Sequence, residues 1–96
     1  MSRKDKLQAS REKIDAIDDE VIALISRRAE LAKQIADLKG KEGTVSYYRP
    51  EREAEVLRRV MNSNPGPLSN KVMAVLFRQI MSACLALEEP IKIAYL

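Results

Sequence analysis

The fold of this 96-residue chain is decided by residues 14–38, IDAIDDEVIALISRRAELAKQIADL. Apolar side chains recur there at heptad spacing in two registers, with Ile14, Val21 and Ile35 in the first and Ile17, Leu24, Leu31 and Leu38 in the second. This period predicts one long amphipathic helix with a continuous apolar stripe.

Arg28 interrupts that stripe, because it occupies the first register midway between Val21 and Ile35. A guanidinium cannot lose its proton to escape burial. A core position for Arg28 would therefore require an anion or a carboxylate partner. Arg28 is the first candidate for binding an anionic ligand.

Two breaks divide the rest of the chain into further helices. The long helix should run from about Asp5 to Lys39 and stop at Gly40. A short helix should start around Pro50, which precedes acidic residues, and end near Asn62. After an Asn-Pro-Gly-Pro turn at 64–67, Ser69 is a good N-cap for a medium helix that ends before Pro90. We predict an all-α fold of three helices.

The predicted long helix, at roughly 50 Å, is too long for the two other helices to cover. A second copy of the same helix is the expected cover, which predicts an intertwined homodimer whose isolated monomers are unstable. Residues 1–90 are expected to form this domain. Residues 91–96, IKIAYL, alternate like a β-strand and are expected to begin a following domain, with a frayed apolar tail as the alternative.

Composition excludes several classes of function. The net charge is +3, and basic residues are not gathered on one face, so we predict no nucleic-acid partner and no membrane partner. A single Cys, at position 84, excludes an internal disulfide, and no leader is evident, so a cytoplasmic protein is expected. His is absent and the single Cys has no partner, which excludes zinc sites and His-based catalysis. We predict no metal and no cofactor.

Helical geometry separates the basic residues of the long helix into those that can share one site and one that cannot. Arg28 and Lys39 are 11 residues apart, so they share a face at a separation of about 16 Å, within reach of one small anion. Arg11 lies about 25 Å from Arg28 along the helix and cannot join them in one chain. It would act in the site of a second, antiparallel copy, or else be an ordinary solvated residue.

Two carboxylates complete the candidate site. Glu53 lies beside Arg52 at the edge of the apolar face formed by Val56, Leu57 and Val60; it could accept a hydroxyl, or simply interact with the helix dipole. Glu88 follows Cys84 by one turn on an apolar stripe, so it must be paired, protonated or frayed into water. Basic groups, carboxylates and apolar walls without a nucleophile suit a small, multiply anionic substrate that needs positioning and electrostatic stabilisation.

The chain resembles the all-helical chorismate mutases from Leu7 to Glu89. The resemblance is carried by four motifs: REKI at 11–14 with Asp18, RRAELA at 27–32 with Lys39, YRPERE at 48–53, and FRQIMS at 77–82 leading to Glu88. It implies the pericyclic rearrangement of chorismate to prephenate, without a covalent intermediate or cofactor. The tail resembles a junction into prephenate dehydratase, which implies a natural fusion and a role in phenylalanine biosynthesis.

The resemblance also implies a role for each candidate residue. Arg28, and Arg11 of the other subunit, would bind the substrate carboxylates, while Lys39 and Glu88 would donate to the ether oxygen. Arg52 would support the carboxylate side and Glu53 would accept the ring hydroxyl. The apolar walls would be Ile35, Met81 and Leu85.

Three positions depart from one common version of the family pattern. Glu88 stands where some members have Gln, and it can donate only when protonated, which predicts a raised pKa and activity that falls toward alkaline pH. Cys84 stands where Ser often assists a carboxylate, so it would contribute through its backbone or as a wall. Arg49 stands where some members have an acid, which leaves its contact with substrate open.

Two alternatives to a mutase compete for the same sequence. An isochorismate pyruvate lyase would share the helical scaffold and much of the site. A non-catalytic dimerisation module for a larger enzyme would explain the heptads, but not Arg28 in an apolar register or Glu88 on an apolar stripe.

Overall fold

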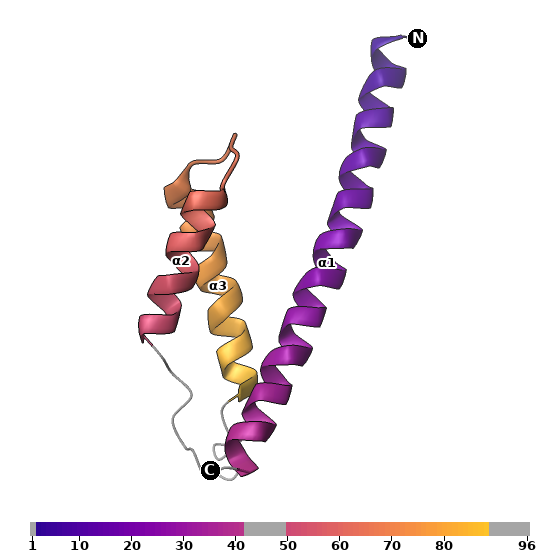
Figure 1. Ribbon diagram of the computed structural model, residues 1–96. Helices are drawn as coiled ribbons and strands as arrows, with labels where there is room; N and C mark the ends of the chain where they lie inside the picture. Colours follow the sequence, from indigo (N-terminus) through magenta and orange to yellow (C-terminus); the bar gives the residue numbers. More distant parts are fainter. Residues whose placement is uncertain (1, 42–49, 89–96) are drawn as a thin grey trace, which may run out of the picture.

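The computed structural model describes residues 2–41 and 50–88. It contains three helices, α1 at Arg3–Lys41, α2 at Pro50–Ser63 and α3 at Asn70–Glu88 (Figure 1). The prediction of an all-α chain with one long, one short and one medium helix is confirmed. The tail at 91–96, predicted to begin another domain, lies outside the described residues.

The two ends of α1 differ slightly from the prediction. The helix begins at Arg3 because Ser2 is its N-cap: the Asp5 N–H donates to Ser2 Oγ at 3.1 Å and the Lys6 N–H to the Ser2 carbonyl at 3.1 Å. At the other end the helix continues through Gly40 to Lys41, past the predicted stop. Glycine lowers helix stability by about 1 kcal/mol but does not forbid a helix.

The turn between α2 and α3 is fixed by Asn64. Its side-chain amide donates to the Leu68 carbonyl and to Asn70 Oδ1, both at 2.8 Å, and its Oδ1 accepts the Gly66 N–H at 3.1 Å. Gly66 has a φ of 78°, a conformation that suits glycine. Ser69 Oγ then accepts the Val72 N–H at 3.1 Å, which confirms the predicted cap of α3.

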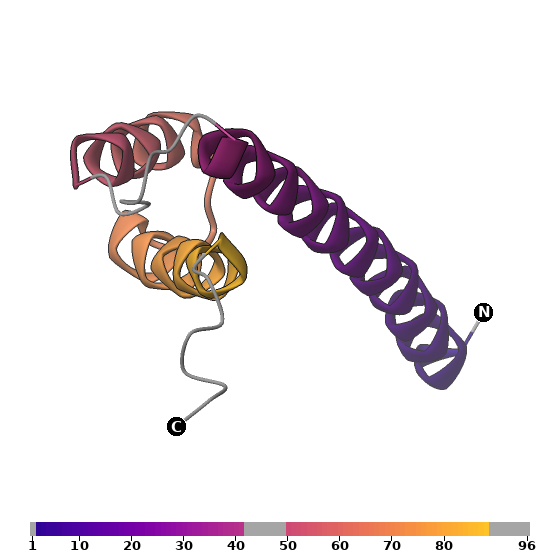
Figure 2. The ribbon, with the colours of Figure 1, turned by 90° about the horizontal axis from the view of Figure 1, so that it is seen from below.

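Helix α3 packs against both of the other helices. The α2–α3 hairpin lies beside the C-terminal half of α1, and the N-terminal half of α1 extends away from it (Figures 1 and 2). The buried apolar residues follow this arrangement, and they are few and mostly small: Ala32, Val56, Leu57, Ala74 and Cys84. The core of the single chain is therefore confined to the half of the molecule that holds the hairpin.

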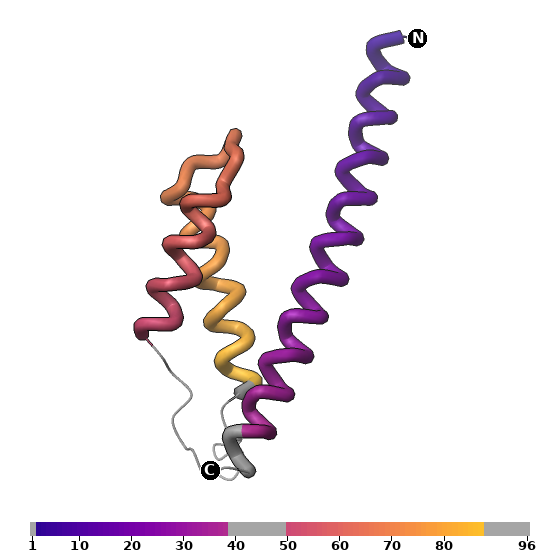
Figure 3. The backbone as a smooth tube through the Cα atoms, in the orientation of Figure 1, coloured from indigo at the N-terminus to yellow at the C-terminus, as the bar shows by residue number. Residues whose placement is uncertain are grey.

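The heptad stripe of α1 is uncovered in the single chain. Its seven apolar side chains, from Ile14 to Leu38, are each 45–58% exposed. Helix α1 instead contacts α3 through the adjacent face, where Arg28, Ala29, Ala32 and Ala36 are half-buried or buried. The tube in Figure 3 follows the resulting elongated shape, whose extents are 61 × 29 × 24 Å.

Candidate active site

Several of the predicted site residues lie toward one end of the molecule. At this end α1 finishes, α2 begins and α3 finishes (Figure 1). Arg28, Glu53, Met81 and Leu85 are half-buried there, and Cys84 is buried with 3% exposure. Helical periodicity predicted Arg28 and Glu53, and the family resemblance predicted Met81, Cys84 and Leu85; each of the five lies on or beside a face that the fold covers.

Arg28 is the half-buried cation of this site. It shares its face of α1 with Ala29, Ala32 and Ala36, whose short side chains let the backbone of α3 approach closely. Among the side chains that the structure describes, at 2–38 and 50–87, no carboxylate pairs with Arg28. A guanidinium that is partly withdrawn from water and lacks an internal partner is suited to binding an external anion.

Two further predicted residues are placed by their helices alone. Lys39 belongs to the last turns of α1, 11 residues beyond Arg28, which puts the two Cα atoms about 16 Å apart on one face. Glu88 is the final residue of α3, one turn beyond the buried Cys84. The side chains of Lys39 and Glu88 are not among those that the structure describes.

Helix α2 contributes a carboxylate and an ion pair. Glu53 is half-buried at the edge of the face that buries Val56 and Leu57, as predicted. Arg52, by contrast, is exposed and its Nη1 donates to Glu55 Oε1 at 2.7 Å. The hydrogen bond and charge of Arg52 lower the pKa of the Glu55 carboxyl below its ordinary value. Sequence reasoning missed this pair, although its i,i+3 spacing was a visible signal.

Two of the predicted residues, Arg11 and Ile35, lie apart from the others. Arg11 is exposed in the N-terminal half of α1, about 25 Å along the helix from Arg28. Ile35 is 46% exposed on the heptad stripe, so in the single chain it forms no enclosed wall. Arg49 lies outside the described residues. The site of one chain is therefore open on the side where the stripe is bare.

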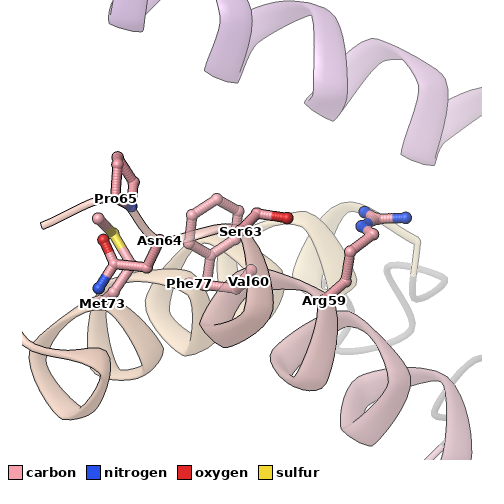
Figure 4. Close-up of a pocket in the computed structure, with 7 residues that line it drawn as sticks. All are labelled: Arg59, Val60, Ser63, Asn64, Pro65, Met73 and Phe77. Carbon is pink, nitrogen blue, oxygen red and sulfur yellow. The ribbon is translucent and has the colours of Figure 1, made fainter.

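A hollow of about 300 Å³ lies at the opposite, turn end of the α2–α3 hairpin (Figure 4). Its lining consists of four apolar residues, Val60, Pro65, Met73 and Phe77, and three polar residues, Arg59, Ser63 and Asn64. No predicted site residue lines it, so it is distinct from the candidate site. Within the described part of the chain, no group of three or more Cys, Asp and Glu residues could hold a metal ion.

Comparison with known proteins gives a consistent match. The family model of type II chorismate mutase matches residues 10–89. A bifunctional chorismate mutase/prephenate dehydratase of Stutzerimonas stutzeri is 50% identical over the whole of this chain, which spans 27% of that protein's length. The chain thus covers about a quarter of such bifunctional relatives.

Solved structures agree in fold. A chorismate mutase from Thermus thermophilus superposes with a TM-score of 0.83 at 35% identity, over 86% of this chain and 93% of that one. A chorismate mutase from Helicobacter pylori, solved in complex with prephenate, superposes with a TM-score of 0.78 at 26% identity, over 88% of this chain and 90% of that one.

Proposed function

Because this chain belongs to the type II chorismate mutase family, we propose that it is an isomerase that rearranges chorismate to prephenate. The observation that carries the proposal is the placement of Arg28, a half-buried cation on the face of α1 that packs against α3, with no carboxylate partner among the side chains that the structure describes. The prephenate bound to the mutase from Helicobacter pylori supports the same assignment.

The reaction places modest demands on the side chains. It breaks one C–O bond and forms one C–C bond within a single molecule, so the enzyme must fold the substrate and stabilise the charge that develops on the ether oxygen. Arg28, together with Arg11 of a second copy, would hold the two carboxylates. Lys39 and a protonated Glu88 would donate to the ether oxygen.

The other candidate residues would shape the pocket. Glu53 would accept the ring hydroxyl from the first turn of α2, and Met81 and Leu85 would line the ring from α3, with Ile35 facing them from α1. Buried Cys84 would act through its backbone or as part of the wall. Arg52 could support the carboxylate side after leaving Glu55, because an exposed ion pair is only weakly stabilising.

The bare stripe of α1 supports a homodimer. The radius of gyration is 18.0 Å, whereas a compact chain of this length would have about 12 Å. An antiparallel second α1 laid on the stripe would cover its apolar residues and bring the partner's Arg11 toward Arg28. The open side of each site would then be closed by the other chain.

The names and lengths of the relatives support a fusion to a second enzyme. We place residues 1–90 in the mutase domain and 91–96 at the start of a prephenate dehydratase domain, as in the bifunctional relatives. Such an enzyme would act in phenylalanine biosynthesis in the cytoplasm.

The test is a comparison of two neighbouring arginines. Chorismate consumption would be followed by absorbance, with product identification, for the wild type, Arg28→Ala and the matched control Arg27→Ala, whose side chain is exposed. We expect prephenate as product, a loss of about 100-fold or more in kcat/KM for Arg28→Ala, and near-normal activity for Arg27→Ala. Equal activity of folded Arg28→Ala and wild type would contradict the proposal, and pyruvate release from isochorismate in a parallel assay would indicate the lyase.

A further inference from the structure

Helix α3 is apolar on two opposite sides, and only one of them is covered. Its inner side, which includes Ala74 and Cys84, is buried. Seven exposed residues form what we call the outer face of α3, within an arc of about 120° on the other side of the helix: Val72, Val75, Leu76, Gln79, Ala83, Ala86 and Leu87. Six of the seven are apolar, and the four large ones are 44–50% exposed.

This pattern is unusual for a surface helix, which normally presents charged and polar residues to water. No charged residue occurs between Arg78 and Glu88. The window Asn70–Leu87 reaches a mean hydropathy of 1.3, enough by length and composition for a membrane span, with only 11% of its residues buried. A span does not fit the fold, however, because the inner side of α3 packs against α1 and α2.

The proposed dimer does not cover the outer face. The second copy is needed where Arg11 can approach Arg28, which is the side of α3 that carries Met81 and Cys84. The outer face lies on the opposite side of the same helix. It therefore remains an exposed apolar surface after the dimer has formed, and a surface of this kind marks an interaction site.

The position of the outer face identifies its occupant. Leu87 belongs to the last turn of α3, and Leu96 is only eight residues beyond Glu88, a distance of at most about 28 Å when fully extended. A domain attached beyond Leu96 would thus be held beside this face, at an effective concentration on the order of millimolar. The bifunctional relatives are nearly four times as long as this chain, which leaves ample protein to form such a domain.

We propose that the outer face of α3 is the docking surface for the domain that follows Leu96. The inference rests on the fusion proposed above. Helix α3 then carries mutase side chains on its inner side and the contact with the following domain on its outer side.

The experiment measures whether the outer face is covered in the full-length protein. Hydroxyl-radical footprinting would report the labelling of Val72 and Leu76 in the wild type and in three variants. Val75→Glu and the nearly isosteric Gln79→Glu place a charge in the proposed contact. Asn62→Glu is the matched control, because it adds the same charge at an exposed position of α2.

The proposal expects low labelling of Val72 and Leu76 in the wild type at every protein concentration. Labelling should rise severalfold in Val75→Glu and Gln79→Glu and stay low in Asn62→Glu. High labelling in the wild type would overturn the proposal, and so would a natural chain that ends at Leu96. Protection that disappears on dilution would assign the face to another copy, and protection only with phosphatidylglycerol vesicles would assign it to a membrane; either result overturns the proposal.

The same samples separate this inference from the proposed activity. Mutase assays on the four proteins should give similar rates, because none of the substituted residues belongs to the candidate site. An active enzyme with a freely labelled outer face would refute the docking surface alone. A protected outer face in a protein that leaves chorismate unchanged would refute the mutase proposal alone.

Discussion

At the scale of single residues, the surroundings of Arg28 explain how a permanent charge can be kept ready in an apolar region. Its neighbours on the same face are alanines at positions 29, 32 and 36. Their small volume lets α3 approach, while the half-buried guanidinium keeps part of its hydration and avoids the full cost of burial. Substrate carboxylates would replace the remaining water at a site where electrostatic attraction is only weakly screened.

Glu88 gives a pH prediction at this scale. If its carboxyl donates to the ether oxygen, activity requires the protonated form and is lost as the pH rises through its pKa. We therefore expect kcat/KM of the wild type to fall between pH 5 and pH 9, and that of Glu88→Gln to stay nearly flat, because an amide donates at every pH.

The measurement is a pair of pH–rate profiles taken with folding checked by circular dichroism at each pH. Glu89→Gln is the control, since it removes a neighbouring carboxyl without touching the proposed donor. A flat wild-type profile, or an alkaline fall that persists in Glu88→Gln, would remove Glu88 from this role.

At the scale of helices, the sequence predicted well which helices form and in what order. It did not predict which helix faces contact one another. Pro50, Ser69 and the turn around Gly66 have local conformational preferences, so the ends of α2 and the start of α3 could be placed from the sequence to within a residue or two. Gly40 was less informative, because a glycine can remain within a helix. The face of α1 that meets α3 could not be predicted, because alanines give a weak periodic signal beside the stronger heptads.

The residues of the candidate site were likewise predicted only in part. Arg28 and Glu53 were found because each places a charge on or beside the apolar face of its own helix, whereas the site role of Cys84 came only from the family resemblance. The Arg52–Glu55 pair was missed because both partners are exposed, and an exposed pair leaves no trace in the apolar periodicity. Which helices meet at the site depends on tertiary packing, and this packing cannot be inferred from the apolar periodicity of each helix.

Ser69 gives a stability prediction for α3. Replacing Ser69 by Ala removes the hydroxyl that accepts the Val72 N–H at 3.1 Å. We expect the free energy of unfolding to fall by about 1 kcal/mol, measured by urea denaturation at a fixed protein concentration. Ser82→Ala is the control, because Ser82 is exposed within α3 and its loss should change stability by less than about 0.5 kcal/mol. Equal effects of the two substitutions would argue against the cap.

At the scale of the whole molecule, a single chain leaves much of its apolar surface exposed and has only a small core. Seven apolar side chains of the α1 stripe face water, the core consists mainly of small residues, and the longest dimension is 61 Å. Burial of the stripe by a second copy would supply the apolar area that one chain lacks. It would also explain why Arg11 and Arg28, which the family resemblance assigns to one site, lie about 25 Å apart in one chain.

Mixing two inactive variants tests this arrangement directly. Arg11→Ala and Arg28→Ala should each be nearly inactive as pure dimers. In a heterodimer of the two, one site combines the intact Arg28 of one chain with the intact Arg11 of the other, and the second site lacks both. Random exchange makes half of the dimers heterodimers with one working site of two, so unfolding and refolding an equal mixture should restore about 25% of wild-type activity, given the two-fold symmetry of the dimer.

Mixing without unfolding is the control, since intertwined chains should exchange slowly and regain activity only after refolding. Light scattering of each variant before and after mixing verifies that all samples are dimers. If Arg11 serves the site of its own chain, every heterodimer carries one defect per site and the refolded mixture remains as inactive as its components. Recovery of activity would thus show that each active site is built from both chains. Its absence would indicate that Arg11 is an ordinary solvated residue.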